Sequence, residues 1–215
     1  MPADPPMPHR RQPQVAGAGD RPETGPLLTW SAPDCAFVLR IGNYREPFAW
    51  PKRGVVFDLA NMKTGWCSTA GRAREWKWNR DKDHFEPRPS SMHKKGFSIP
   101  CSIGGGPTAT WQQSGAASWG SVSALNSWVA AGAELAAGKL PLVKLTGQSV
   151  ETYKRGRTTT PILRVDQWVR RPACLGGEEP FEAVIANAED TAETRRAERE
   201  ARAYINAERQ LDCVR

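Results

Sequence analysis

The sequence lacks the features by which disulfide scaffolds, export signals and membrane spans are usually recognised. Its five cysteines lie far apart and include no Cys-x-x-Cys pair, which predicts free thiols in a reducing compartment. No run approaches the roughly 18 apolar residues of a membrane span. The N-terminal sequence Met-Pro-Ala-Asp-Pro-Pro contains no apolar export segment. We therefore expect a cytoplasmic protein with no membrane partner.

Motifs that would carry catalysis are also scarce. Residues 81–84 (Asp-Lys-Asp-His), with Glu86, have the ligand types of a divalent-metal nuclease, but lysines interrupt them and a surface loop is the better interpretation. Residues 132–139 resemble a phosphate-binding loop, except that Leu140 stands where Ser or Thr would bind Mg²⁺. We predict a protein that is not an enzyme and has no metal or cofactor. The alternative offered by the 81–86 loop is a metal-dependent nuclease.

What the chain does contain is tryptophan and positive charge. Nine of its 215 residues are Trp, and its formal net charge is +7. Residues 1–176 hold 24 basic and 13 acidic side chains, whereas residues 177–215 hold 6 basic and 10 acidic ones. Bases stack on aromatic rings while Lys and Arg bind phosphates. The composition therefore predicts that the basic body binds single-stranded nucleic acid, DNA or RNA.

Composition and periodicity divide the chain into three parts. Seven prolines among the first 26 residues predict a disordered arm over 1–34. Residues 177–215 lack Pro after position 180, are rich in Ala, Glu and Arg, and predict an exposed, acid-leaning helical extension that packs little. Between them, residues 35–176 form the expected nucleic-acid-binding domain. Its expected strands lie at 35–41, 55–59, 74–79, 94–103, 108–112, 141–150 and 160–169, with a helix over 118–137.

With the short segments before the helix grouped into about three main strands, the order is three strands, one helix and two strands, which is the order of an OB-fold. An OB-fold is a five-stranded, partly open barrel that binds oligonucleotides on its second and third strands and on the loops after strands 1 and 4. We therefore expect a mainly β protein with an OB-like barrel, one helix between strands 3 and 4, and a C-terminal helical extension. The cationic segment 153–157 would be the loop between strands 4 and 5.

Strand alternation separates the aromatic residues into two groups. Trp76 and Trp78 share one face of their strand, while the charged Lys77 lies on the other. Because a barrel interior cannot accept the charged side, we expect Trp76 and Trp78 in the core. The rings expected to stack on bases, each contributing about 1–3 kcal/mol, are Trp66, Trp111 and Tyr153. The cations expected to bind phosphates are Arg72, Arg74, Lys77, Arg80, Lys94, Lys95, Lys154, Arg155 and Arg157.

A set of short motifs between residues 54 and 172 resembles bacteriophage and prophage single-stranded-DNA-binding proteins of the OB-fold type. These motifs are Asp58, Thr64-Gly65-Trp66, Trp76-Lys-Trp78, Lys94-Lys95-Gly96-Phe97, Gly138-Lys139-Leu140-Pro141, Thr146-Gly147 and Trp168-Val169-Arg170-Arg171-Pro172. The resemblance implies coating and protection of exposed DNA strands during replication or recombination, without catalysis, in a bacterial host cytoplasm. Replication or recombination proteins would be partners of the C-terminal extension. An adaptor that acts only through this extension is a further alternative.

Overall fold

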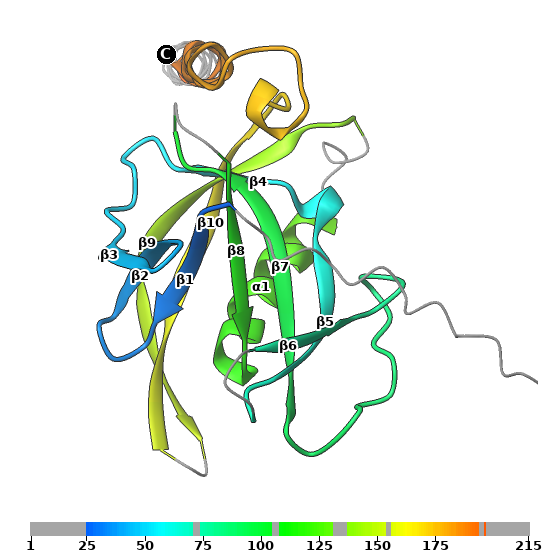
Figure 1. The fold of residues 1–215 in the computed structure, drawn as a ribbon. Helices are drawn as coiled ribbons and strands as arrows, with labels where there is room; N and C mark the ends of the chain where they lie inside the picture. The colour runs from blue at the N-terminus through cyan, green and yellow to red at the C-terminus, as the bar shows by residue number, and fades with distance from the viewer. Residues whose placement is uncertain are drawn as a thin grey trace, which may run out of the picture.

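The computed structural model describes residues 25–70, 74–104, 108–130, 137–153, 156–193 and 196. Within this part of the chain, ten strands form one strongly curled sheet, a half-barrel with few helices (Figure 1). The expectation of a mainly β fold is confirmed. No helix in the described ranges is both long enough and apolar enough to cross a membrane.

In the described part of the chain, one long helix lies between the strands. The first five strands are β1 (Leu27–Ser31), β2 (Ala36–Ile41), β3 (Tyr44–Pro47), β4 (Val55–Phe57) and β5 (Lys63–Ser68). The next five are β6 (Glu75–Trp78), β7 (His93–Ser102), β8 (Thr108–Ser114), β9 (Leu140–Tyr153) and β10 (Gly156–Val169). Helix α1 (Ala116–Ala130) lies between β8 and β9, and short 3-10 turns occur at η1 (Leu59–Asn61) and η2 (Ala173–Leu175).

Strand β7 is the centre of the sheet. One of its edges pairs with β8, and its other edge pairs with β5 and then with β4. Beyond β4 come β9 and β10, which form a long antiparallel hairpin. Beyond β8 comes β1, which runs parallel to β8 and antiparallel to β2. Strand β6 pairs only with β5 among the described strands and extends the sheet sideways from the barrel.

Strand β1 was not expected, because it falls within the segment assigned to a disordered arm. Its Leu28 and Trp30 are buried in the core, and the amide of Gln113 continues its pairing with β8. The Trp30 backbone N–H donates to Gln113 Oε1 at 2.6 Å, and Gln113 Nε2 donates to the Trp30 carbonyl at 2.8 Å. Residues 1–24 of the expected arm lie outside the described part.

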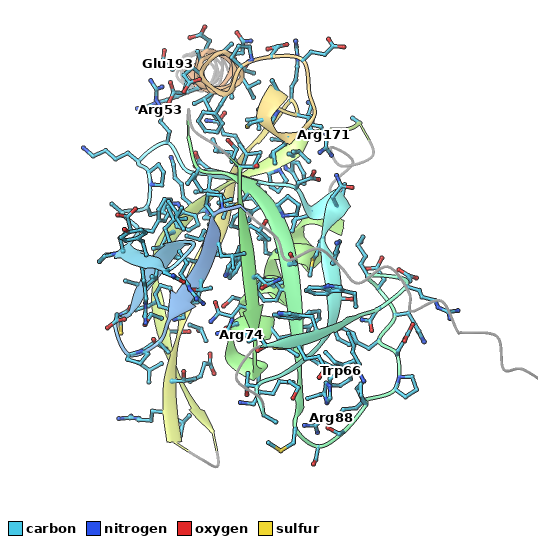
Figure 2. The ribbon with its side chains drawn as sticks, viewed as in Figure 1. Arg53, Trp66, Arg74, Arg88, Arg171 and Glu193 are labelled. Carbon is cyan, nitrogen blue, oxygen red and sulfur yellow. The ribbon has the colours of Figure 1, made fainter. Side chains whose placement is uncertain are left out.

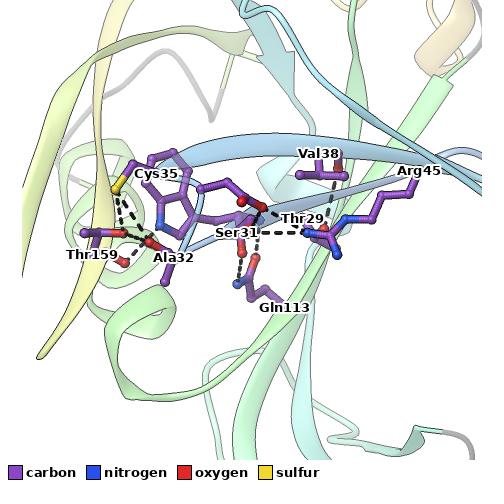
Figure 3. A network of polar contacts seen from close by, with 10 residues as sticks. Thr29, Ser31, Ala32, Cys35, Val38, Arg45, Gln113 and Thr159 are labelled. Carbon is purple, nitrogen blue, oxygen red and sulfur yellow. Dashed lines mark hydrogen bonds and ion pairs between the residues drawn. The ribbon is translucent and has the colours of Figure 1, made fainter. Parts of the chain in front are cut away.

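Side-chain hydrogen bonds join β10 to β1 where the two strands do not pair. The indole Nε1 of Trp30 donates to the Thr159 carbonyl at 2.9 Å, and the Thr159 hydroxyl donates to the Ala32 carbonyl at 2.8 Å. Figure 3 shows Thr159 and Ala32 meeting beside Cys35. These bonds hold the half-barrel curled.

Aromatic rings fill the interior of this barrel. The ring of Trp111 is fully buried and lies against Phe37, Phe57 and Phe97, with centroid separations between 4.8 and 5.6 Å. Aromatic pairs at such distances contribute about 0.5–1.5 kcal/mol each beyond the area they bury. Cys101 lies in the same core, and its burial raises the pKa of the thiol to about 12. Much of the tryptophan content therefore belongs to the core.

A second apolar cluster lies on the outer side of the sheet, at the end opposite β6. Phe181, Val184 and Ile185 of a helix over 181–193 pack against Val56 and against the start of β9. Figure 1 shows this helix lying across one end of the barrel. The expectation that the helical extension packs little is wrong for this first part, because Phe181, Val184 and Ile185 are buried and Ala188 packs beside them.

A buried ion pair connects the barrel to the segment that leads into this helix. The Asp58 side chain is 2% exposed and receives two hydrogen bonds from the Arg171 guanidinium, one of them at 3.1 Å. Asp58 also accepts hydrogen bonds from the backbone and side chain of Asn61, which fix η1 between β4 and β5. The carboxylate therefore holds three segments together.

Removing Arg171 should destabilise the fold much more than removing its neighbour Arg170. Arg171→Ala leaves a buried carboxylate without its cation, which costs about 3 kcal/mol or more. Arg170→Ala breaks an ion pair to Glu179 in which the Arg side chain is 74% exposed, which costs about 0–1 kcal/mol. Urea denaturation of both variants measures the difference. Equal losses of unfolding free energy would contradict this role of the Asp58 ion pair.

Candidate nucleic-acid interface

The register of β5, β6 and β7 sorts their side chains onto two faces. Residues opposite one another on adjacent strands point to the same face, and successive residues along a strand alternate. Phe97 and Ile99 of β7 point into the aromatic core. Lys94, Gly96 and Ser98 therefore point to the outer face of the barrel.

The two tryptophans of β6 lie on this outer face. Gly96 is opposite Gly65, and Gly65 is opposite Trp78, so Trp78 and Trp76 share the face of Gly96. Their rings stack with centroids 4.5 Å apart and planes inclined by 9°, and both side chains are half-buried. The expectation that Trp76 and Trp78 belong to the core is wrong. It failed because β6 extends beyond the barrel, so its charged side is never enclosed.

Two strand glycines allow close approaches beneath the stacked rings: Gly96 leaves room for the Trp76 ring, and Gly65 leaves room for the backbone of β6. A Cβ atom on Gly96 would lie 2.5 Å from Cζ3 of Trp76, closer than real Cβ contacts permit. A Cβ on Gly65 would lie 2.3 Å from the backbone oxygen of Lys77 on the neighbouring strand. Glycine inside a strand often marks such a close approach. These two glycines were the signal in the sequence that could have placed the rings correctly.

Unpaired lysines flank the stacked rings on the same face. Lys94 is in one row with Cys67 and Trp76, two strand spacings or about 10 Å away from the latter. Lys63 is opposite Ser98, one row further along the outer face. Both lysines are exposed, and neither forms an ion pair within the described ranges. We call the surface formed by Lys63, Trp76, Trp78 and Lys94 the outer platform.

Three of the predicted site residues meet on the opposite face instead. Lys77, Trp66 and Lys95 form one row across β6, β5 and β7. The indole Nε1 of Trp66 donates to the Glu86 carbonyl at 2.9 Å, and its ring meets the Phe85 ring edge-on at 5.6 Å. Lys95 Nζ lies 4.4 Å from the centre of the Phe85 ring. The structure thus builds Trp66 into an aromatic and cationic cluster.

The prediction that Trp111 stacks on bases is wrong. Its side chain is fully buried and lies nearly parallel to Phe57 at 5.5 Å, with no face open to a ligand. The ring is enclosed because β8 is paired on both edges, with β7 and with the unexpected β1. In the sequence, the glycines and polar residues near Trp111 favour an exposed strand end, but the pairing of β8 on both edges overrides that signal.

The remaining predicted cations do not form one surface in the described part. Arg74 is exposed directly before β6, and Arg80 is exposed directly after it, 3.9 Å from Glu86. Figure 2 shows Arg74, Trp66 and Arg88 at the end of the barrel away from Arg53 and Glu193. Arg157 is exposed at the start of β10. Four predicted residues are not covered by the description: Arg72, Lys154 and Arg155 lie outside the described residues, and the side chain of Tyr153 is not described.

The carboxylates of the 81–86 loop are engaged with their own neighbours. Asp81 Oδ1 accepts a hydrogen bond from the Asp83 backbone at 3.0 Å, Lys82 Nζ lies 3.0 Å from Asp83 Oδ2, and Glu86 faces Arg80. In the ranges that the structure describes, no group of three or more His, Cys, Asp or Glu side chains is placed to hold a metal ion.

Comparison with known proteins does not assign the chain to a family. No family model matches the chain, and neither a search of curated proteins nor one of solved structures found a match.

Substituting Gly96 tests the packing of the outer platform. Gly96→Ala would push its Cβ into the Trp76 ring, and such overpacking costs about 1–3 kcal/mol. Gly147→Ala is the control, because Gly147 also lies within a strand and its Cβ would meet only Ile162 at 4.0 Å. Urea denaturation should show a loss for Gly96→Ala alone. Part of that loss should disappear when Trp76→Leu removes the ring. The rest should remain, because the added Cβ would also lie 2.8 Å from the backbone oxygen of Gln113. A loss that Trp76→Leu leaves entirely unchanged would show that the ring does not occupy this position.

Proposed function

We propose that this protein binds single-stranded DNA without catalysis and protects exposed strands during replication or recombination. The observation that carries the proposal is the outer platform, where a stacked pair of half-buried tryptophans on β6 shares one face of the sheet with two exposed lysines on β5 and β7. Rings that offer a stacking face, next to cations that accept phosphates, are the two components of sequence-tolerant binding to single strands.

The strand connections support an OB-like barrel as the scaffold for this function. Strands β4 and β5, interrupted by η1, correspond to the first strand of an OB-fold, and β7 and β8 correspond to the second and third. Helix α1 follows, and β9 and β10 correspond to the fourth and fifth strands. The antiparallel pairing of β4 with β9 gives the contact between the first and fourth strands. Strand β1 occupies the position beside β8 where the fifth strand would close the barrel.

The outer platform coincides with the surface that an OB-fold uses for oligonucleotides. That surface covers the second and third strands and the loop after the first. Here the second strand is β7, which provides Lys94, and the connection after β5 contains β6 with Trp76 and Trp78. The cationic 153–157 segment is the equivalent of the loop between strands 4 and 5, and Arg157 would extend the phosphate contacts.

A preference for single strands follows from the exposure of the rings. In a duplex the base faces are already stacked on one another, so Trp76 and Trp78 have no free base face to contact. In a single strand, each base that continues the indole stack contributes about 1–3 kcal/mol. Phosphate contacts from Lys63 and Lys94 would add affinity without sequence preference.

Intrinsic tryptophan fluorescence during titration with a thymidine oligomer tests the proposed function directly. We expect saturable quenching by the single strand that weakens as salt rises, and a much poorer response to matched duplex. Adding EDTA should change neither result and should leave the oligomer intact. Absence of saturable binding, confirmed by a label-free assay, would refute the proposal. Metal-dependent loss of the oligomer would favour the nuclease alternative instead.

Neutralising the two platform lysines should reduce the salt dependence of binding. Each phosphate contact to a single strand contributes about 0.7 to the slope of log K against log salt concentration. The double substitution Lys63→Gln with Lys94→Gln should therefore lower the magnitude of that slope by about 1.4. Lys52→Gln is the control, since Lys52 is equally exposed but lies before β4, away from the platform. The same slope in both variants would remove these lysines from the interface.

A further inference from the structure

A small cavity lies on the side of the sheet opposite the outer platform. Its volume is about 160 Å³, below the roughly 300–1,000 Å³ of pockets that take drug-sized ligands. It therefore has room for a single small ring system. Met62, Thr64 and Val122 form its buried floor.

Two aromatic rings and two lysines surround this cavity. The rings of Phe85 and Trp119 stand nearly perpendicular, at 88°, with centroids 5.0 Å apart. Lys95 Nζ lies 4.4 Å from the centre of the Phe85 ring and 5.9 Å from that of Trp119. Lys82 lines the cavity beside Asp83, with which it is paired. A flat ring with an attached anion would contact the two aromatic rings and Lys95.

The buried polar groups of the floor are already satisfied and leave the rings and Lys95 to select the ligand. The Thr64 hydroxyl donates to the Lys82 carbonyl and receives a hydrogen bond from Asn79 Nδ2, both at 2.8 Å. No hydrogen bond of the floor needs to be broken for a ring to enter. The chemistry that remains available is an aromatic wall and the ammonium group of Lys95, since Asp83 at the rim offsets the charge of Lys82. A nucleotide, with a flat base and a phosphate, fits this arrangement.

Strands β5 and β7 separate this cavity from the outer platform, and β6, beside β5, forms the edge of the sheet. Among the described strands it pairs only with β5. Lys77 on its inner face and Arg80 directly after it are exposed. A nucleic-acid strand leaving Trp78 can follow these cations around the edge and reach Lys95.

We propose that the Phe85–Trp119 cavity holds one unstacked nucleotide of the bound strand. Its base contacts the two rings and its phosphate contacts Lys95, because Lys82 is already paired with Asp83. This assignment rests on the proposed function, since it places a second contact of the same single strand. The nucleic-acid strand is then bound on both faces of the β5–β7 sheet. A duplex cannot bind in this way, because its bases are paired and stacked and cannot enter the cavity.

Photocrosslinking with a thymidine oligomer that carries 5-iodouracil tests the cavity. The labelled base is moved through successive positions of the oligomer, and crosslinked peptides of the full chain are identified by mass spectrometry. We expect crosslinks to Phe85 or Trp119 from one label position, and crosslinks to Trp76 or Trp78 from others. Phe85→Leu should abolish the first set and weaken binding about five-fold or more. Phe48→Leu, a half-buried core ring away from the cavity, should leave both unchanged.

Substitution of two adjacent lysines provides a second test of the cavity, one that leaves the core side chains unchanged. Lys94 and Lys95 are both exposed and point to opposite faces of β7. Lys95→Gln should reduce crosslinking in the cavity while crosslinking at Trp76 or Trp78 persists, and Lys94→Gln should do the reverse. Saturable binding with crosslinks confined to Trp76 or Trp78, and unaffected by Lys95→Gln, would overturn the cavity alone. Absence of any single-strand binding would overturn the proposed function and the cavity with it.

Discussion

The pairing of β7 on both of its edges is the constraint on which the rest of the structure depends. This strand has ten residues and joins β8 on one side to β5 and β4 on the other. Its register makes alternate residues point in opposite directions, so that Phe97 and Ile99 enter the aromatic core while Lys94 and Gly96 face outward. A shift of one residue would bury Lys94 and expose Phe97. The core and the outer platform are therefore set by the same hydrogen bonds.

This coupling explains how a tryptophan-rich chain divides its rings between stability and binding. Trp111 and Trp30 are enclosed because strands lie on both sides of them, and they contribute to the aromatic core. Trp76 and Trp78 belong to β6, which lies beyond the barrel and has one partner strand. Their stacking on each other, with the Trp76 ring against Gly96, orders them before any ligand arrives. Pre-ordered rings lose less entropy when a base stacks on them.

The strand pattern was largely predictable from the sequence, because period-two alternation over residues 94–103 and a helical period over 118–137 are local signals. Strand β1 was missed since Leu28 and Trp30 follow a proline-rich segment. Strand β5 was missed because Gly65 interrupts it and only pairing with β6 and β7 makes it regular. Such pairings join residues far apart in sequence, which local periodicity does not report.

The candidate site was less predictable than the fold, because it too depends on pairings between residues far apart in sequence. Lys94 and Arg74 were expected to face a ligand and are exposed. The predictions for Trp111 and Trp76 were wrong in opposite directions. Trp111 was expected to bind and lies in the core, whereas Trp76 was expected in the core and lies on the surface. Which face of a strand is buried depends on where the strand lies in the sheet, and β6 lies outside the barrel. Gly65 and Gly96 were the local sequence feature that indicated how closely β6 and its tryptophans approach β5 and β7.

The most direct test of this account is to follow the indole N–H signals of the tryptophans by NMR while a thymidine oligomer is added. Individual Trp→Phe variants assign the signals. The account predicts that the signals of Trp76 and Trp78 shift progressively and saturate together, while those of Trp111 and Trp30 remain in place. Saturable binding that shifts other signals and leaves Trp76 and Trp78 unchanged would contradict the claim that the outer platform contacts the strand.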